Sequence, residues 1–275
     1  MAEFLASLEP DEPIPVLLGI PGASIHNLME DFMHDGPLGI IQDVNGSLLF
    51  ELASEGAFGL APDAGGWIAK LDFQLYDGFR MFEDWMRAEG KRCSQNPFRV
   101  LNLEMVKKTD WPCLKGKAKN SMVVLEWLAT VSALFVGTAH CNMRNDVAQA
   151  FNNICKLVEQ TKFPRWQLSE SQLRSMEINR QMALLGLHAL CKACGRMDVY
   201  RFRLRPKFHR FDHGLRRCVR TRVSPSVNWS FSPEDMMGLC ARMCNKIHGS
   251  SISKRAVQRW MLFFFCELED SDCEQ

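Results

Sequence analysis

The sequence predicts a mainly α fold: one large helical domain with a few short β-strands. Apolar residues recur every three or four positions over much of the chain, which is the spacing of one helical face. Helix-start signals accompany this pattern, among them Ser169 followed by Gln172, the pattern of a capping box. Alternation of apolar and polar residues is confined to short stretches, so strands are expected to be few.

Four helices are expected in the first half of the chain. Three of them are predicted at 24–34, 36–56 and 67–90. In the second, one face is formed by Leu38, Ile41, Val44, Leu48 and Leu52. The stretch 121–137 is apolar almost throughout, as a buried helix should be. The loose alternation of 97–106 leaves room for a short strand.

The second half is expected to alternate helices with two short strands. The helices are predicted at 145–160, 169–196, 232–248 and about 252–267. The strands are predicted at 199–205, where VYRFRLR has period two, and at 227–231. No internal repeat or clear linker interrupts this order. We therefore expect a single domain over 1–275, with 197–275 holding a basic strip and the C-terminal helices.

Composition places the chain among ordinary globular proteins of a reducing compartment. Net charge is +1, and apolar and charged residues make up 47% and 24% of the chain. The odd number of 11 scattered cysteines, with no basic, apolar leader, favours free thiols. The longest apolar runs, such as 260–266, are too short to cross a bilayer. An intracellular protein, nuclear or cytoplasmic and without a membrane partner, is expected.

Charge is distributed unevenly. The first 65 residues contain no Lys or Arg, whereas Arg201 to Arg222 contains nine and a single acid, Asp212. On a strand, alternating arginines would share one face and could follow the phosphates of DNA or RNA, with phenylalanines between them to stack on bases. The candidate nucleic-acid-binding residues are Arg201, Arg203, Arg205, Lys207, Arg210, Arg216, Arg217 and Arg220. The alternative is a solvated charged edge whose phenylalanines, Phe202, Phe208 and Phe211, turn into the core.

Cysteine and histidine recur at a spacing close to that of a zinc site. CKAC (191–194) is followed after fourteen residues by the first histidine of RPKFHRFDH (205–213). A structural Zn²⁺ takes four such ligands in a tetrahedron. The candidate metal ligands are Cys191, Cys194, His209 and His213. Because CKAC ends a predicted helix rather than forming a tight turn, free thiols beside a structural histidine pair are the alternative.

Three short stretches follow one another in the order EDFMHDGPLGI (30–40), RPKFHRFDH and NWSFSPEDMMG (228–238). In this order they resemble segments of the RNase-H-like DDE transposases of the CACTA-related kind. The resemblance implies a partial RNase-H-like core, with 67–196 as a helical insertion. It also implies that Asp31, with His34 beside it, and Glu234 are catalytic carboxylates for Mg²⁺ or Mn²⁺. On their own terms, Asp31 could be a helix-surface acid and Glu234 an acid favoured by a helix N-terminus.

One departure from the family pattern argues against activity. The family carries a first catalytic aspartate on an early central strand, and only 30 Pro-rich residues precede Asp31 here. The expected function is therefore that of a transposable-element-derived, nucleic-acid-associated fragment that is catalytically inactive alone. The alternative is a helical scaffold or protein-interaction domain with no nucleic-acid role.

Overall fold

A computed structural model describes residues 31–59, 66–93, 97–106, 110–162 and 165–228. Contacts divide the chain into residues 1–228 and 229–275, and the second unit lies wholly outside the described ranges. The predicted helices at 232–248 and 252–267 fall there, so they stay predictions. The predicted single domain over 1–275 stays a prediction for the same reason.

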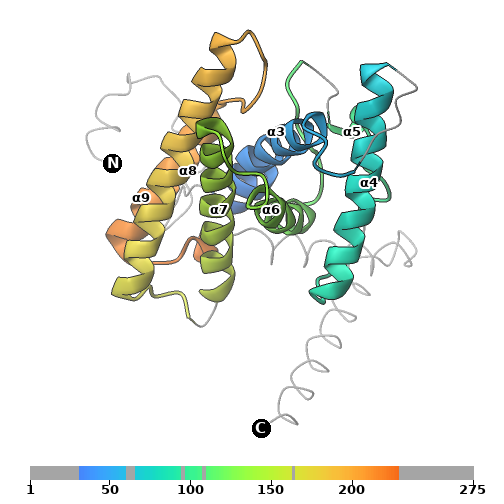
Figure 1. Ribbon diagram of the computed structural model, residues 1–275. Helices are drawn as coiled ribbons and strands as arrows, with labels where there is room; N and C mark the ends of the chain where they lie inside the picture. Colours follow the sequence, from blue (N-terminus) through green and yellow to red (C-terminus); the bar gives the residue numbers. More distant parts are fainter. Residues whose placement is uncertain (1–30, 60–65, 94–96, 107–109, 163–164, 229–275) are drawn as a thin grey trace, which may run out of the picture. The chain divides into compact units, whose positions relative to one another are not determined.

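The first unit is built from helices that follow one another along the chain (Figure 1). They are α2 (Phe32–Asp35), the π-helix η3 (Gly36–Ile40), α3 (Ile41–Ser54), α4 (Trp67–Ala88), α5 (Leu103–Val106), α6 (Ala118–Ser132), α7 (Ala139–Gln160), α8 (Glu170–Arg196), α9 (Pro206–Thr221) and the 3-10 helix η4 (Pro225–Asn228). The mainly α fold is thus confirmed. None of the helices described is long and apolar enough to cross a membrane.

The expected short strands are absent from the described ranges. The predicted strand 97–106 is irregular up to Asn102 and ends in α5. Residues 199–205 form no strand either, because the backbone bends at Phe202, whose φ of 54° is left-handed. Of the predicted strand 227–231, the first two residues belong to η4 and the rest lies outside the described residues. The bridge between Gln167 and Val223 is the β-pairing seen in this part of the chain. Period two alone was a poor guide, because a strand needs both an extended backbone and a neighbouring strand to pair with, and 199–205 has neither among the residues described.

Helix α3 is the centre of the unit. It contacts α4, α5, α6 and α7, and Figure 1 shows it between α4 on one side and α7 and α8 on the other. Every residue from Ile41 to Ala53 is buried, polar ones included. The predicted single apolar face was therefore too narrow. The backbone of Cys113 approaches α3 so closely at Gly46 that a Cβ there would overlap the Cys113 nitrogen.

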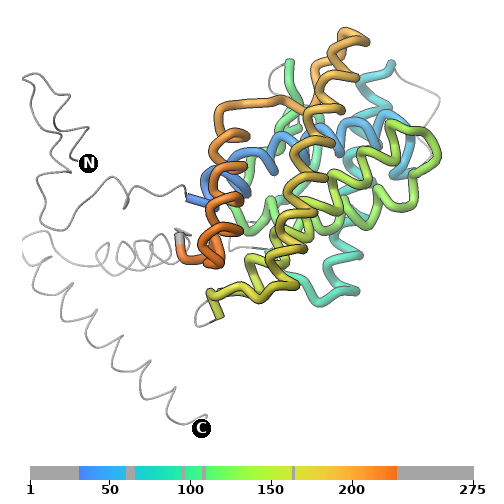
Figure 2. Tube along the Cα trace, turned by 90° about the vertical axis from the view of Figure 1, so that its left-hand side faces the viewer, coloured from blue at the N-terminus to red at the C-terminus, as the bar shows by residue number. Residues whose placement is uncertain are grey.

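Helices α7, α8 and α9 pack together on the side of α3 away from α4 (Figure 1). Helix α7 packs along α8, and α8 packs on α9. The capping box at the start of α8 is confirmed, because the Ser169 side chain accepts from the Gln172 amide and the Gln172 side chain accepts from the Ser169 amide. Helix α9 turns back onto α2 and η3, and Figure 2 shows this meeting of the two ends of the described chain.

Candidate functional site: the basic segment and the buried Glu51 network

The basic segment, residues 201–222, is paired with acids of the first described helices. Three ion pairs form what we call the charge ladder: Arg201 with Glu51, Arg205 with Asp43, and Arg210 with Asp35. The arginine numbers rise along the ladder while the acid numbers fall, so the two segments lie antiparallel. The three carboxylates are buried, with side chains 3–5% exposed. Part of the uneven charge of the sequence is therefore matched within the fold, where cations of residues 201–210 neutralise acids of residues 35–51.

Burial sets the electrostatics of this ladder. Desolvation raises the pKa of Asp43 above its ordinary value, although the Arg205 guanidinium opposes the shift. Burial likewise raises the pKa of Asp35 against the opposing charge of Arg210. A buried carboxylate without a cation would cost several kcal/mol, so the arginines serve the fold here. Arg201 and Arg205, predicted to follow phosphates, are therefore placed as structural cations.

The remaining predicted cations lie along α9, which the sequence did not mark as a helix. Its buried stripe is Phe211, Leu215 and Cys218. The exposed set, which we call the outer face of α9, is His209, His213, Arg216 and Arg220. The two sets are offset by two residues, or about 200° of helical rotation, so they point in opposite directions. Arg210 and Arg217 flank the outer face, while Arg203 is exposed in the segment that precedes the helix.

Few acids oppose this face. Helix α9 carries five Lys or Arg and one acid, Asp212. Asp212 is bonded to Arg180 of α8 and lies 3.0 Å from the Arg216 Nε, whose side chain is still 62% exposed. Lys207 instead turns inward and donates to the carbonyl of His34 at 2.8 Å.

The phenylalanines of the segment do not form an exposed stacking surface. Phe202 is 0% exposed and Phe211 2% exposed, while Phe208 is half-buried. Phe211 packs on Phe32 and Phe151 with ring centroids 5.4 and 6.0 Å apart. Two of the three thus turn into the core, as the alternative interpretation predicted.

The four predicted zinc ligands do not come together among the residues described. His209 and His213 are neighbours, with ring centroids 4.3 Å apart. Their turn of α9 meets α8 at Arg180, which bonds Asp212. Cys191 lies eleven residues farther along α8, which is about 16 Å of helix. Sequence spacing could not show that α9 runs back along α8, which carries the two histidines away from the end of α8 where the two cysteines lie.

Of the two predicted catalytic carboxylates, only Asp31 is described. It caps α2: Oδ1 accepts from the Met33 amide at 2.9 Å, and Oδ2 lies 2.5 Å from His34 Nδ1. The D-x-x-H spacing thus brings the two side chains together, as expected for an acid and a residue one helical turn later. Glu234 lies outside the described residues, so its distance from Asp31 stays open.

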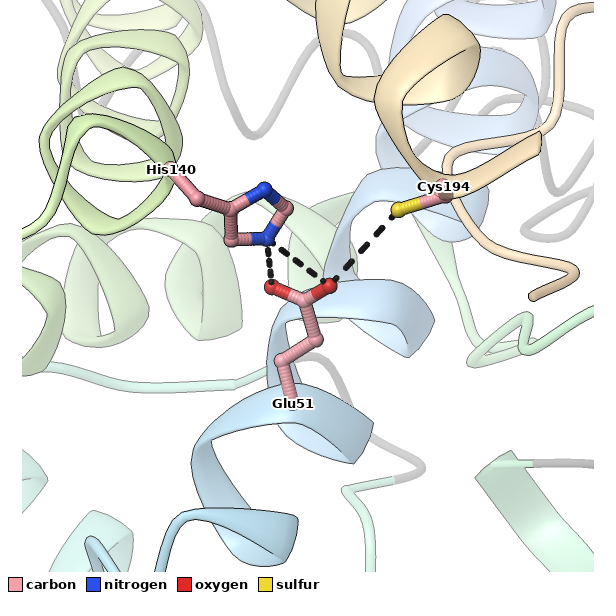
Figure 3. A group of neighbouring side chains, drawn as sticks. All are labelled: Glu51, His140 and Cys194. Atoms are coloured by element: carbon pink, nitrogen blue, oxygen red, sulfur yellow. Dashed lines mark hydrogen bonds and ion pairs between the residues drawn. The ribbon is translucent and has the colours of Figure 1, made fainter. Parts of the chain in front are cut away.

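A second polar cluster, which the sequence did not predict, lies around Glu51 and is called here the Glu51 network. Its members are Glu51 and Glu55 of the α3 end, His140 and Arg144 of α7, Cys194 of α8, and Arg201. Figure 3 shows His140 and Cys194 converging on the Glu51 carboxylate from different helices. Such a cluster within a helical core is unusual, because each buried ionic group must be matched by partners.

Distances within the network divide it into a tight pair and a looser centre. Arg144, whose side chain is fully buried, holds both oxygens of Glu55 at 2.7 and 2.8 Å. Glu51 has longer contacts: 3.0 Å to His140 Nε2, 3.2 Å to Arg201, 3.3 Å to Arg144 and 4.0 Å to Cys194 Sγ. Charge-assisted bonds normally lie near 2.7–2.9 Å. The Glu51 carboxylate is therefore surrounded by donors without being held closely by any one.

The groups of the network shift one another's protonation. The hydrogen bond that His140 donates to the Glu51 carboxylate raises the pKa of His140, against the effect of its burial. Burial would raise the pKa of Glu51, but His140 and the two arginines outweigh it and hold that pKa below its ordinary value. Burial, reinforced by the nearby Glu51 charge, raises the pKa of the Cys194 thiol to about 11. Because the acid lies between thiol and imidazole, the imidazole is not placed to activate Cys194 as a nucleophile.

Little in the sequence could have revealed this network. The partners of Glu51 on other elements lie 89 to 150 residues from it along the chain. One signal was present: Glu51 is a lone acid directly after an apolar run, and the structure shows that this part of α3 is buried. An acid inside a buried helix requires partners, and the basic segment supplies one of them, Arg201.

Comparisons with known proteins add no relative: no family model, curated protein or solved structure matches the chain. The resemblance to CACTA-related transposases therefore stays a prediction carried by its short motifs.

Proposed function

We propose that this chain is a nucleic-acid-associated helical protein that binds polyanions through the outer face of α9. The observation that carries the proposal is the opposition of faces on that helix. Phe211, Leu215 and Cys218 anchor it, so Arg216 and Arg220 project away from the core. A rigid helix that presents cations in one direction can contact successive phosphates.

The proposal narrows the binding set that the sequence predicted. Arg201 and Arg205 neutralise buried carboxylates and are excluded from direct binding. Arg203, Arg216, Arg217 and Arg220 are retained. Arg210 is retained as well, because its side chain is 56% exposed although it pairs with buried Asp35, and His209 and His213 lie beside these cations. Sequence-independent binding is expected, because the retained groups are suited to phosphates and the buried phenylalanines offer no base stacking.

Descent from a CACTA-related transposase is part of this proposal, supported by the ordered motifs and by the adjacency of Asp31 and His34. A partial RNase-H-like core would need a central sheet, and the residues described contain none. We therefore propose association with nucleic acid and no nuclease chemistry.

Fluorescence anisotropy with labelled random-sequence DNA and RNA tests the proposal. Binding is expected at about 50 mM salt and should weaken steeply towards about 200 mM. The double variant R216A/R220A should lower the slope of log K against log salt by about 2, one for each lost phosphate contact. The matched control is R80A/R87A, which removes two exposed arginines that pair with acids on α4.

Two results would overturn the proposal. Equal losses in both double variants would mean that only total charge matters. No binding at about 50 mM salt, where phosphate contacts are strong, would instead support the second candidate, a helical scaffold. That candidate is favoured by one specific observation: the charge ladder uses three of the nine basic residues internally.

A further inference from the structure

Three side chains of the Glu51 network carry donor atoms suited to a metal. A Glu51 oxygen, a His140 ring nitrogen and Cys194 Sγ lie within 4.8 Å of one another, and they form the only such group of three or more among the residues described. Ligands at ordinary zinc bond lengths of 2.0–2.3 Å in a tetrahedron are about 3.3–3.6 Å apart. Glu51 Oε1 lies 3.2 Å from His140 Nε2 and 4.0 Å from Cys194 Sγ, and these two separations bracket this range.

We propose that Glu51, His140 and Cys194 bind Zn²⁺, or a divalent ion of the same borderline-soft class, with a fourth position open to water. Thiolate and imidazole are the ligands that such ions prefer over Mg²⁺ or Ca²⁺. Each ligand comes from a different helix, α3, α7 or α8, so the ion would tie three elements together (Figure 3). The His140 side chain is 29% exposed, which gives the site a side open to solvent.

This ligand set differs from the one that the sequence spacing suggests. Only Cys194 is common to both. Cys191, the other half of CKAC, is not in the group, and His209 and His213 belong to the outer face of α9. The proposal is independent of polyanion binding, because none of its ligands lies on that face.

Charge balance permits a cation despite the two arginines. Arg144 is matched by its bidentate bond to Glu55, leaving Arg201 and Glu51 as the second pair. Coordination requires the Cys194 thiolate and a neutral His140: the S–H bond breaks and its proton leaves to water, while the proton on His140 Nε2, which faces Glu51, moves to Nδ1 or to water, so that a sulfur pair and a nitrogen pair are free to bind the metal. Three anions then face two guanidiniums, so the ion enters a cluster of net charge −1.

Metal binding would require Arg201 to give up its contact with Glu51. Its guanidinium lies 3.2 Å from Glu51 and 4.8 Å above the Phe50 ring, and its side chain is 21% exposed. A metal at Glu51 would compete with this contact, so Arg201 should weaken metal binding without being a ligand. Removing it is expected to strengthen the site, an outcome that a purely structural cluster would not give.

Titration of the reduced full-length protein with Co²⁺ tests the site. Co²⁺ takes zinc positions and, when bound by thiolate, gives a charge-transfer band in the near ultraviolet and d–d bands in the visible. One equivalent is expected to bind, and Zn²⁺ should displace it. C194S should abolish the charge-transfer band, and H140A should weaken binding at least tenfold. R201A should tighten binding severalfold.

The controls use the other predicted ligands. C191S and H209A/H213A should leave the spectrum and the affinity unchanged. Far-ultraviolet circular dichroism of each variant shows that it is folded; if C194S does not fold, H140A, at a partly exposed position, decides. No charge-transfer band at one equivalent in the wild type, or a band lost in C191S and retained in C194S, would overturn the proposal.

Discussion

Arg205 of the basic segment forms an ion pair with Asp43, a carboxylate buried in α3. Its neighbour Arg203 belongs to the same alternating run of arginines but is exposed. The structure thus separates two residues that the sequence presents as equivalent. One closes the fold over a buried charge, and the other faces solvent.

This difference predicts unequal effects on stability. R205A leaves Asp43 buried without its cation and should lower the free energy of unfolding by about 3 kcal/mol or more. R203A should change it by less than about 0.5 kcal/mol, as most surface substitutions do. Urea unfolding followed by circular dichroism measures both. Because D43N removes the stranded charge, the double variant D43N/R205A should be more stable than R205A alone, and a further loss would contradict the ion-pair explanation.

Substitution of two glycines by alanine, at Gly46 and at Gly195, should have opposite effects on stability. A methyl group at Gly46 would overlap the backbone at Pro112 and Cys113, so G46A should destabilise the protein by about 1–3 kcal/mol through overpacking. At Gly195, in the last turn of α8, a methyl group would meet nothing within 4 Å, and G195A should be neutral or stabilising by up to about 1 kcal/mol. Thermal denaturation of both variants provides the comparison. An equal loss in the two would mean that close approach at Gly46 is not the cause.

Glu126 predicts a dependence of stability on pH. Burial would raise its pKa, but Lys91 and Lys156, 2.9 and 3.0 Å away, outweigh this and hold the pKa below the ordinary 4.5. A carboxyl whose pKa is lower when folded stabilises the protein above its unfolded pKa, and the contribution is lost as pH falls through the folded pKa. E126Q should therefore be less stable than the wild type at pH 7. The difference should shrink below about pH 4.5, and urea unfolding across that range would contradict this if the gap stayed constant.

The thiols should differ in reactivity. Cys155 is buried in α7, and burial raises its pKa to about 12, whereas Cys191 is partly exposed. Because the thiolate is the reactive form, iodoacetamide should modify Cys191 well before Cys155 in the native protein. Mass spectrometry of peptides over time measures the order. In denaturant both should react at similar rates, and early native labelling of Cys155 would argue against the packing of α7.

Local signals in the sequence were enough for several helices. The predicted stretch 67–90 corresponds to α4, and Ser169 with Gln172 starts α8 as expected. Boundaries that depend on a cap were harder: α7 begins at Ala139 because Thr138 caps it, six residues before the predicted start. These features depend on neighbours within a turn or two, which is why a periodic pattern can reveal them.

What the sequence could not reveal depends on distant partners. The period-two stretch around Phe202 predicted a strand, yet its alternation reflects a buried phenylalanine between arginines that meet acids of α3. The predicted zinc ligands failed to meet because α9 runs back along α8. Glu51 acquires its role only when three helices converge on it. Such arrangements are properties of the tertiary fold and have no local signature.

The charge ladder also bears on how the chain folds as it is made. Arg201 and Glu51, one pair of this ladder, are 150 residues apart. During synthesis, α3 would emerge long before the arginines that neutralise its carboxylates. Its carboxylates would therefore stay exposed to solvent until those arginines are made. Contacts of such high sequence separation close large loops and slow folding. Completion of the fold around α3 should therefore await release of residues 201–210 from the ribosome.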